Sequence, residues 1–280
     1  MNRGSTCNNG LHFYLLGDVH IEKERSFEAI FLPRPVQSLL GYLLVYRDRI
    51  HSREALAARL WDDDDTVRSR ACLSTALWRL RRIIEQDVSR GTYLVQTAQT
   101  DIKFNTTSPY SLDVEILESK LSRLVATPID KLAEPQVSES EDALALYRGD
   151  LLEGHDADWV VGERERLRAL YLDSLVVAME YRASRGDYSR ALAHGHKALH
   201  IEPLREDIHR TVMHLYAQSG RIAQALRQFN VCRDLLHKEL GIAPMRTTLA
   251  LHDEIARQVA ISSRTPMSAQ TQRVPRGSTQ

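Results

Sequence analysis

The second half of the chain repeats a short glycine-led pattern, and this repeat limits the folds that are open to it. The pattern GDYSRAL, which begins at Gly186, returns at Gly220 as GRIAQAL, a spacing of 34 residues (220 minus 186). Apolar residues follow each copy at helical spacing. A repeat of this length is a pair of helices that cannot bury its apolar faces alone, so neighbouring pairs must stack on one another. The repeat therefore predicts an all-helical second half.

The spacing is the period of tetratricopeptide repeats. In the first copy, Ala198 and Pro203 stand where such a repeat needs a small packing residue and a helix terminator. In the second copy Phe229 fits the pattern, but Cys232 replaces an alanine and His237 stands in place of the proline. Because the terminator is missing, the last helix of the second copy is expected to run on past His237.

The first half of the chain has a different pattern, in which strand-like and helix-like segments follow one another. Residues 11–32 are rich in β-forming residues around a Gly-Asp break and predict short antiparallel strands. Two helices are expected next, over residues 36–49 and 52–61, and Ser52 is the expected N-cap of the second. Residues 92–105 hold two further strand-like runs around a polar turn and predict a β-hairpin.

Two segments carry few residues that could pack in a core. Ala126–Ser140 is polar and contains proline, which is typical of a linker or long loop. The last residues, SSRTPMSAQTQRVPRGSTQ, have too few apolar side chains to pack, so residues 261–280 are expected to form a disordered tail.

Between the second helix and the hairpin lies a segment with one-sided charge, Val67–Ile84, which has five arginines and no acid. On a helix of roughly 100° per residue, one stripe consists of Leu73, Leu77, Leu80 and Ile84. The opposite face consists of Arg68, Ala71, Thr75, Trp78, Arg79 and Arg82. The apolar stripe can pack in a domain, while guanidinium groups can pair with phosphate or with guanine in the major groove.

Charge and element order both favour DNA as the partner of this face. The chain has 37 basic and 37 acidic residues, but residues 66–90 carry six arginines against Glu85 and Asp87, a local net charge of +4. The order of elements predicts a winged helix-turn-helix: two helices, the second with an arginine-rich face, and then a β-hairpin. Two alternatives stay open: arginine-rich faces are often only solvated, and Trp78 could pack beneath the hairpin or against the second half.

Cysteine usage and hydropathy bound the compartment. Cys7, Cys72 and Cys232 are far apart and odd in number, which argues against a disulfide framework or a metal-binding pair and favours a reducing compartment. The N-terminus has no apolar signal-peptide region, and the longest apolar run, Leu39–Tyr46, is too short to span a bilayer. A cytoplasmic protein is expected.

Enzyme motifs are missing from the sequence. His194, His196 and His200 include a pair at i and i+4, but no carboxylate stands at a matching offset, so solvated or partly packed histidines are expected rather than metal ligands. There is no GxSxG, HExxH or phosphate-loop pattern. No catalytic activity, metal or cofactor is therefore expected, and no receiver or ATPase module.

Taken in order, these segments resemble the Streptomyces antibiotic regulatory protein (SARP) family. LLGDVHIE, LSTALWRLRRII and GTYLV are similar to a winged helix of the OmpR/PhoB kind, and the stretch from ALALYRGDLLEG to LLHKELGIAP resembles the bacterial transcriptional activator domain that follows it. The resemblance covers about residues 11–257. It implies an α+β fold, with a winged helix-turn-helix domain over residues 11–107 and an all-α, tetratricopeptide-like helical domain over residues 110–260.

The resemblance implies a sequence-specific activator that binds direct repeats in promoter DNA. Val67–Ile84 would be the recognition helix and Thr92–Asn105 the wing. The implied DNA-binding residues are Thr75, Trp78, Arg79 and Arg82 towards the groove, Arg68, Arg70 and Arg81 nearer phosphates, together with Ser74 and Lys103. Two departures bear on specificity, because such helices often carry a smaller residue than Trp78, and Lys103 is the only basic residue of the wing.

The resemblance also implies protein partners. Asp62, Asp63, Asp64 and Asp65 occupy the turn of the helix-turn-helix, where they could meet a basic sigma-factor surface of RNA polymerase. Alternatively, Asp65 caps the recognition helix and its neighbours offset the helix dipole. A homodimer on tandem half-sites and a place in the bacterial nucleoid are expected from the family. The rival interpretation is a tetratricopeptide-like adaptor whose N-terminal domain binds protein and not DNA.

Overall fold

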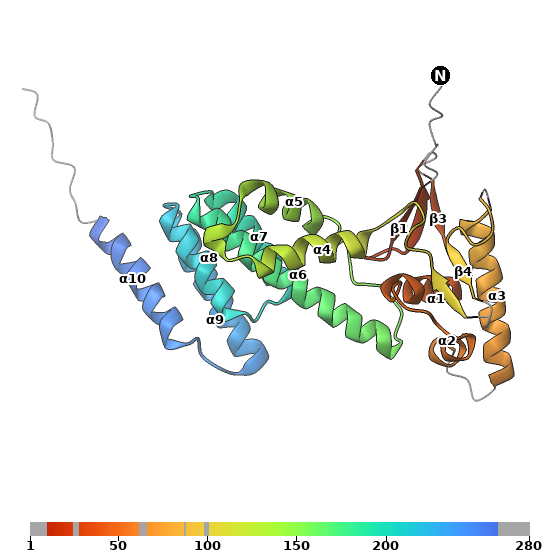
Figure 1. The fold of residues 1–280 in the computed structure, drawn as a ribbon. Coiled ribbons are helices and arrows are strands. Elements are labelled where there is room, and N and C mark those ends of the chain that lie inside the picture. The colour runs from red at the N-terminus through yellow and green to blue at the C-terminus, as the bar shows by residue number, and fades with distance from the viewer. Residues whose placement is uncertain (1–9, 25–27, 62–65, 87, 98–100, 263–280) are drawn as a thin grey trace, which may run out of the picture. The chain divides into compact units, whose positions relative to one another are not determined.

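The computed structural model describes residues 10–24, 28–61, 66–86, 88–97 and 101–262 of the protein (Figure 1). The chain divides into two compact units within helix α6 (Asp158–Ser184), the first ending at Val177 and the second beginning at Ala178. Strands occur only before α4 in the described part of the chain, and helices make up the rest. The α+β fold class predicted from the sequence is therefore confirmed.

A four-stranded sheet, in the order β3-β2-β1-β6, begins the first unit. Its strands are β1 (Leu11–Tyr14), β2 (His20–Lys23), β3 (Ala29–Phe31) and β6 (Tyr110–Leu112). The first three pair antiparallel, as predicted, whereas β6 pairs parallel with β1. β6 was not predicted, because only three residues pair and a proline stands directly before them. Leu11 and Phe13 are buried and alternate with half-buried neighbours, so one face of the sheet packs on the core.

Three helices and a hairpin complete the winged helix. They are α1 (Arg34–Val45), α2 (Arg53–Leu60), α3 (Thr66–Ile84), β4 (Leu94–Gln96) and β5 (Ile102–Phe104). The Oγ of Ser52 accepts a hydrogen bond from the N–H of Ala55 (3.2 Å), which confirms the predicted N-cap of α2. Leu39, Leu40, Leu43 and Leu44 give α1 a fully buried face.

The remaining helices of the first unit are α4 (Asp113–Ala126), a short 3-10 helix (Ile129–Lys131), α5 (Glu134–Leu144) and the first part of α6. The linker predicted over Ala126–Ser140 is wrong, because α5 begins inside it. Pro135 occupies the first turn of α5, where a missing N–H costs nothing, and Val137 is buried. A polar composition thus concealed a helix that buries only one narrow stripe.

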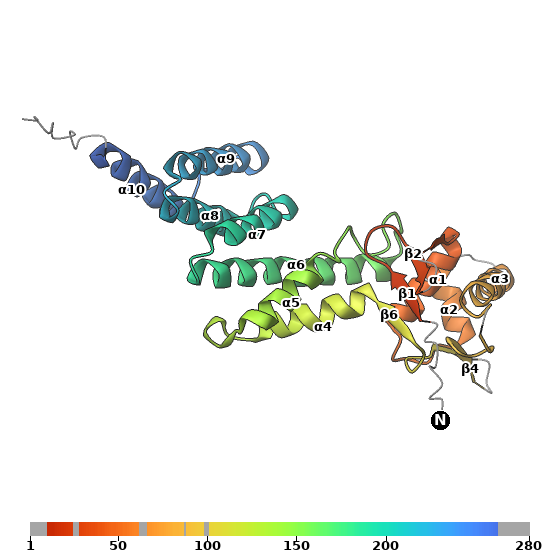
Figure 2. The ribbon, with the colours of Figure 1, turned by 90° about the horizontal axis from the view of Figure 1, so that it is seen from above.

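The second unit is a stack of helices, α7 (Tyr188–Ile201), α8 (Glu206–Gln218), α9 (Ile222–Leu240) and α10 (Arg246–Ser262), in which α7, α8 and α9 lie side by side in chain order (Figure 2). The two repeated glycines both have positive φ, +75° at Gly186 and +74° at Gly220, and each stands just before a helix. Ala191 and Ala225 take equivalent, fully buried positions. The predicted helical repeat is therefore confirmed.

The end of α9 also agrees with the sequence. The helix runs past His237 to Leu240 and stops at Gly241, whose left-handed conformation (φ 68°) is a common helix terminator. α10 was not singled out from the sequence; Ile255 of this helix packs with Met213 and Phe229 in the core of the second unit. The predicted domain boundaries at residues 107, 110 and 260 stay predictions, and most of the predicted tail lies outside the described residues.

Candidate nucleic-acid interface

The recognition-helix candidate, α3, is divided into a buried and an exposed face. Leu73, Leu77, Leu80 and Ile84 are all at most 5% exposed. The exposed residues of the other face are Arg68, Arg70, Ala71, Ser74, Thr75, Trp78, Arg79 and Arg82. The amphipathic pattern predicted from the sequence is therefore confirmed, and it leaves a cationic surface for an external partner.

Trp78 lies in the middle of this surface. Its side chain is 60% exposed, so the alternative in which it packs beneath the hairpin is wrong. The guanidinium of Arg82 lies 5.4 Å from the centre of the indole ring, a cation–π contact. The pair presents a flat apolar plane and a positive charge next to each other, which suits contact with a base edge or a thymine methyl group.

Two hydroxyl groups on the exposed face are partly used within the helix. The Oγ1 of Thr75 donates to the carbonyl oxygen of Ala71 (3.0 Å), and the Oγ of Ser74 donates to that of Arg70 (2.8 Å). Ser74 also accepts a hydrogen bond from Arg53 at the start of α2 (2.8 Å). The oxygen of Thr75 keeps acceptor capacity for a donor on DNA, while Ser74 holds Arg53 against the helix.

Glu85 fixes the wing relative to α3. Its Oε1 accepts hydrogen bonds from the N–H groups of Gly91 (3.1 Å), Tyr93 (3.0 Å) and Leu94 (2.9 Å), while Oε2 pairs with Arg81 at 2.8 Å. The side chain of Glu85 is only 3% exposed, and that of Arg81 only 15%. Arg81 is thus engaged in holding the wing, and its assignment as a phosphate contact stays a prediction.

The hairpin is also tied to the turn before α2. The N–H of His51 donates to the Ile102 carbonyl (2.9 Å), and the N–H of Ile102 donates to the His51 carbonyl (2.8 Å). The Nε2 of His51 donates to the Tyr46 carbonyl (3.1 Å), and burial lowers the pKa of the ring. Burial therefore favours the neutral ring. The base of the hairpin is attached to the turn before α2 by the two backbone hydrogen bonds between His51 and Ile102.

A groove of about 400 Å³ separates α3 from the hairpin. Its lining includes three residues that the sequence analysis did not assign, Arg53, Arg90 and Gln96, beside Trp78 and Arg82. Arg53 comes before the recognition helix and Arg90 after it, so the fold, and not the helical pattern of α3, brings their side chains to the groove. The acid in the groove, Glu85, has both oxygens engaged, which leaves the groove with a cationic character.

The remaining predicted contacts are less informative. Lys103 is half-buried in β5 and does not line the groove, and the tip of the wing at residues 98–100 lies outside the described residues. Asp62, Asp63, Asp64 and Asp65, the predicted polymerase contact, also lie outside them. In the second unit, His196 lies 2.7 Å from the hydroxyl of Tyr216 and His194 is buried, as expected for partly packed histidines.

Neither a metal cluster nor a membrane span was found within the described residues. No group of three or more His, Cys, Asp or Glu side chains there is placed to hold a metal ion. Likewise, no described helix combines the length and the apolar character that crossing a bilayer requires.

Comparison with protein families gave two matches. Residues 112–256 match the family described as "Bacterial transcriptional activator domain". Residues 28–100 match the family described as "Transcriptional regulatory protein, C terminal". The second match spans most of the winged helix, and the first begins at the end of β6.

Similar proteins include regulatory proteins of Streptomyces and Mycobacterium. The chain is 26% identical over 254 residues to the regulatory protein AfsR of Streptomyces griseus, a match that covers 89% of this chain and 25% of AfsR. It is 23% identical over 278 residues to the transcriptional regulatory protein MoaR1 of Mycobacterium tuberculosis, which covers 98% of this chain and 86% of MoaR1. The chain thus spans about a quarter of the length of AfsR but most of that of MoaR1.

A solved structure has the same fold. Mycobacterium tuberculosis EmbR, determined in complex with a low affinity phosphopeptide, superposes with a TM-score of 0.69. The superposition covers 92% of this chain and 72% of the EmbR chain, at 18% sequence identity. At this identity the likeness concerns the fold alone.

Proposed function

The chain belongs to the bacterial transcriptional activator domain family and has the architecture of the SARP regulators, and from this premise we propose that it binds promoter DNA sequence-specifically and recruits RNA polymerase. The family is one of transcriptional regulators. The observation that carries the proposal is the division of α3, whose leucine stripe is buried while its arginines and Trp78 are exposed on the opposite face.

In this proposal α3 enters the major groove. Thr75, Trp78, Arg79 and Arg82 read base edges, because they share the exposed face. Phosphate contacts position a protein but carry no sequence information, and in the proposal they come from Arg68, Arg70, Arg81, Ser74, Arg53, Arg90 and Lys103. Arg53 and Arg90 approach from the groove beside the hairpin, so they extend the contact beyond the recognition helix.

The test is charge reversal on the exposed face, with a matched control. The double change Arg79→Glu and Arg82→Glu should weaken binding to a promoter fragment about a hundredfold or more, since each good base contact is worth about 1–3 kcal/mol. Arg221→Glu with Arg227→Glu makes the same change of charge on exposed residues of the second unit and should leave the affinity within about threefold.

Salt dependence checks the electrostatic part of the proposal. With at least three phosphates neutralised, log K against log salt should have a slope of about −3 or steeper. Unchanged affinity after the double change in α3 would remove the recognition-helix assignment. A chain that binds no DNA fragment even at low salt would instead favour the adaptor interpretation.

Recruitment of polymerase is assigned to the acidic turn Asp62–Asp65. Replacing Asp63 and Asp64 with asparagine should abolish transcription activation in vitro while DNA affinity stays unchanged, because the turn would face the sigma factor and not the DNA. Loss of DNA affinity in the same variant would instead favour the alternative in which Asp63 and Asp64 offset the dipole of α3.

Assembly on DNA is the last part of the proposal. Two copies would bind adjacent half-sites, so sedimentation with a two-site fragment should give a complex of two chains per duplex. One chain per duplex at saturation would exclude the homodimer. Nucleoid association follows from the same proposal, and a fluorescent fusion spread evenly through the cell would contradict it.

A further inference from the structure

Residues 148–157, between α5 and α6, lie against the winged helix, and we call this segment the latch. Two backbone hydrogen bonds attach it to the end of β1: the N–H of Gly17 donates to the Asp150 carbonyl (3.0 Å), and the N–H of Leu152 donates to the Leu15 carbonyl (2.9 Å). Gly149 approaches so closely that a Cβ there would lie 2.9 Å from the Cα of Gly17. The latch is therefore in backbone contact with the sheet.

Leu152 inserts the latch into the core of the first unit. Its side chain is fully buried, and its backbone adopts a left-handed conformation (φ 49°) that non-glycine residues rarely take. The side chain packs on Gly41 in the middle of α1, where an added Cβ would lie 2.6 Å from Cδ1 of Leu152. The strained backbone persists because this contact and the hydrogen bonds around it hold it in place.

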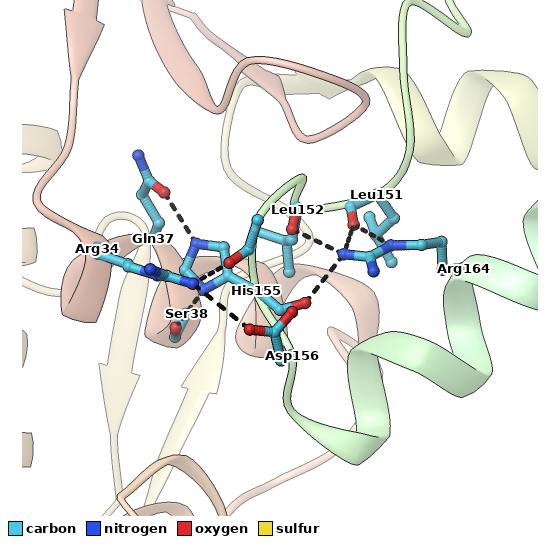
Figure 3. A network of polar contacts seen from close by, with 9 residues as sticks. Arg34, Gln37, Ser38, Leu151, Leu152, His155, Asp156 and Arg164 are labelled. Carbon is cyan, nitrogen blue, oxygen red and sulfur yellow. Dashed lines mark hydrogen bonds and ion pairs between the residues drawn. The ribbon is translucent and has the colours of Figure 1, made fainter.

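A polar network secures the rest of the latch to α1 (Figure 3). The ring of His155 has its Nδ1 2.9 Å from the Ser38 hydroxyl, and its Nε2 donates to the Gln37 side-chain oxygen at 2.9 Å. Arg34, at the start of α1, donates to the Gly154 carbonyl. Three side chains from the first turns of α1 thus hold two positions of the latch, Gly154 and His155.

Arg164 holds the same segment from the opposite side, on α6. Its guanidinium donates to the carbonyl oxygens of Leu151 (3.1 and 3.0 Å), Leu152 (2.9 Å) and His155 (3.0 Å), as Figure 3 shows. One side chain therefore satisfies three backbone acceptors. A shift of this part of α6 has to break these bonds or carry the latch with it.

α1 connects the latch to the recognition helix. One side of α1 packs on α3 in the core of the winged helix. On α6, Trp159 contacts the ring of Tyr42 edge-on at 5.0 Å, and Glu163 accepts a hydrogen bond from Tyr46 (3.2 Å). The described contacts thus run without interruption from α6 through the latch and α1 to α3.

We propose that the latch is a coupling device, through which a displacement of α6 by a ligand, partner or modification changes the stability and placement of the recognition helix. Arg164 acts in it as a positioning residue. The proposal concerns motion within the first unit and holds whether or not the exposed face of α3 binds DNA. Its test therefore needs no DNA, and its failure is distinguishable from a failure of the proposed function.

The experiment is hydrogen–deuterium exchange of the full chain, in the wild type and in Arg164→Met. The variant keeps the apolar stem and removes the donors to the latch. Exchange at the amides of Leu152 and His155 should rise at least tenfold, and exchange in α3 at least threefold, while α8 and α9 stay at the wild-type rate. Arg166→Met is the control on the same helix. Arg166 pairs with Glu118 and with Glu163, which accepts a hydrogen bond from Tyr46 of α1, so this variant perturbs the direct contact between α6 and α1 and leaves the latch intact.

Leu152→Gly is the second variant, and it is decisive if Arg164→Met does not fold. It relieves the left-handed backbone and removes the packing on Gly41 without altering α1, and the same exchange pattern is expected. The proposal is overturned if the latch exchanges faster while α3 does not, or if the latch rate does not rise. It is also overturned if every helix exchanges faster, since the network would then be a general stabiliser, or if Arg166→Met gives the same result as Arg164→Met.

Discussion

At the scale of single residues, Glu85 joins α3 to the wing through four hydrogen bonds. A carboxylate at the C-terminal end of a helix is disfavoured by the helix dipole, and burial adds a desolvation cost. Three backbone donors from the start of the wing and the guanidinium of Arg81 offset both. The sequence alone did not reveal this role, because Glu85 counted there only as a charge beside six arginines.

Replacing Glu85 with alanine should destabilise the first unit. The change leaves three backbone N–H groups and Arg81 without their acceptor, so we expect the free energy of unfolding to fall by about 2–4 kcal/mol. Urea unfolding followed by tryptophan fluorescence measures this. Gln86→Ala, at the exposed neighbour, is the control and should change stability by less than about 0.5 kcal/mol. A loss as small as that of the control would show that the wing is held by other contacts.

His155 should make stability depend on pH. Burial, together with Arg34 and Arg164, lowers the pKa of its ring below the usual value of 6.5, so the folded state prefers the neutral form. Above the unfolded pKa both states are neutral and full stability is present; as pH falls through 6.5 towards the folded pKa, the unfolded state takes up the proton first and stability is lost.

The melting temperature of the wild type should therefore fall between about pH 7.5 and about pH 5.5, and that of His155→Gln should fall less. Burial also lowers the pKa values of His51, His196 and His209, so part of the pH dependence will persist in the variant. Identical pH profiles for the two proteins would show that His155 does not contribute.

At the scale of elements, a helix or strand could be predicted where nearby residues in the sequence determine it. The stripe on α3 and the long α9 follow from helical periodicity and from the placement of terminators, both of which are visible in the sequence. α5 was mistaken for a linker because its polar composition outweighed a narrow apolar stripe. β6 depends on pairing with a strand about a hundred residues away, which no local pattern shows.

The residues of the candidate interface were likewise predictable only where their placement depends on local helical periodicity. The exposed side chains of α3 were assigned to the correct face, whereas Arg53 of α2 joins them only through the tertiary fold. For Arg81, the family resemblance implied a phosphate contact, but Arg81 pairs with the neighbouring carboxylate of Glu85 at the base of the wing. Contacts between elements decide which partner a charged side chain binds, and a helical projection of the sequence does not show such contacts.

Two neighbouring positions of α3 should respond in opposite ways to alanine. Leu80 is fully buried, so Leu80→Ala should cost about 2–5 kcal/mol of stability through lost packing and a cavity. Trp78 is 60% exposed, so Trp78→Ala should cost less than about 1 kcal/mol, chiefly the contact with Arg82.

The affinity for DNA should show the opposite ranking of these two variants. Below its melting temperature Leu80→Ala should keep promoter affinity, whereas Trp78→Ala should lose affinity or change the preferred sequence. Chemical unfolding and fluorescence anisotropy are the measurements. A Trp78→Ala protein with wild-type affinity and sequence preference would place the indole outside the contact with DNA.

On the scale of the whole molecule, the winged helix passes into α4 through hydrogen-bonded structure and not through a flexible connection. β6 passes directly into α4, whose first residue is Asp113. The Oδ2 of Asp113 accepts hydrogen bonds from the N–H groups of Leu15 and Leu16, both at 2.9 Å, and Oδ1 accepts one from Val114 at 2.7 Å. The junction itself therefore fastens α4 to the end of β1.

Fragments of the chain should reveal this dependence. A fragment of residues 10–107 lacks β6 and Asp113, so we expect it to melt without cooperativity or to aggregate. A fragment of residues 10–177 keeps β6, the carboxylate and the latch, and should melt in a single cooperative transition. Calorimetry compares the two, and equal melting temperatures would show that the winged helix is complete by residue 107.

The parallel pairing of β6 with β1 also bears on how such regulators can be recombined. Because its sheet takes a fourth strand from residues beyond the wing, the winged helix is not a self-contained domain that can be transferred alone. If the winged helices of two regulators were exchanged at a junction directly after the wing, each sheet would receive its edge strand from the other protein. In hybrid proteins the junction should instead lie within a helix after the latch, so that each winged helix keeps its own β6 and its own latch.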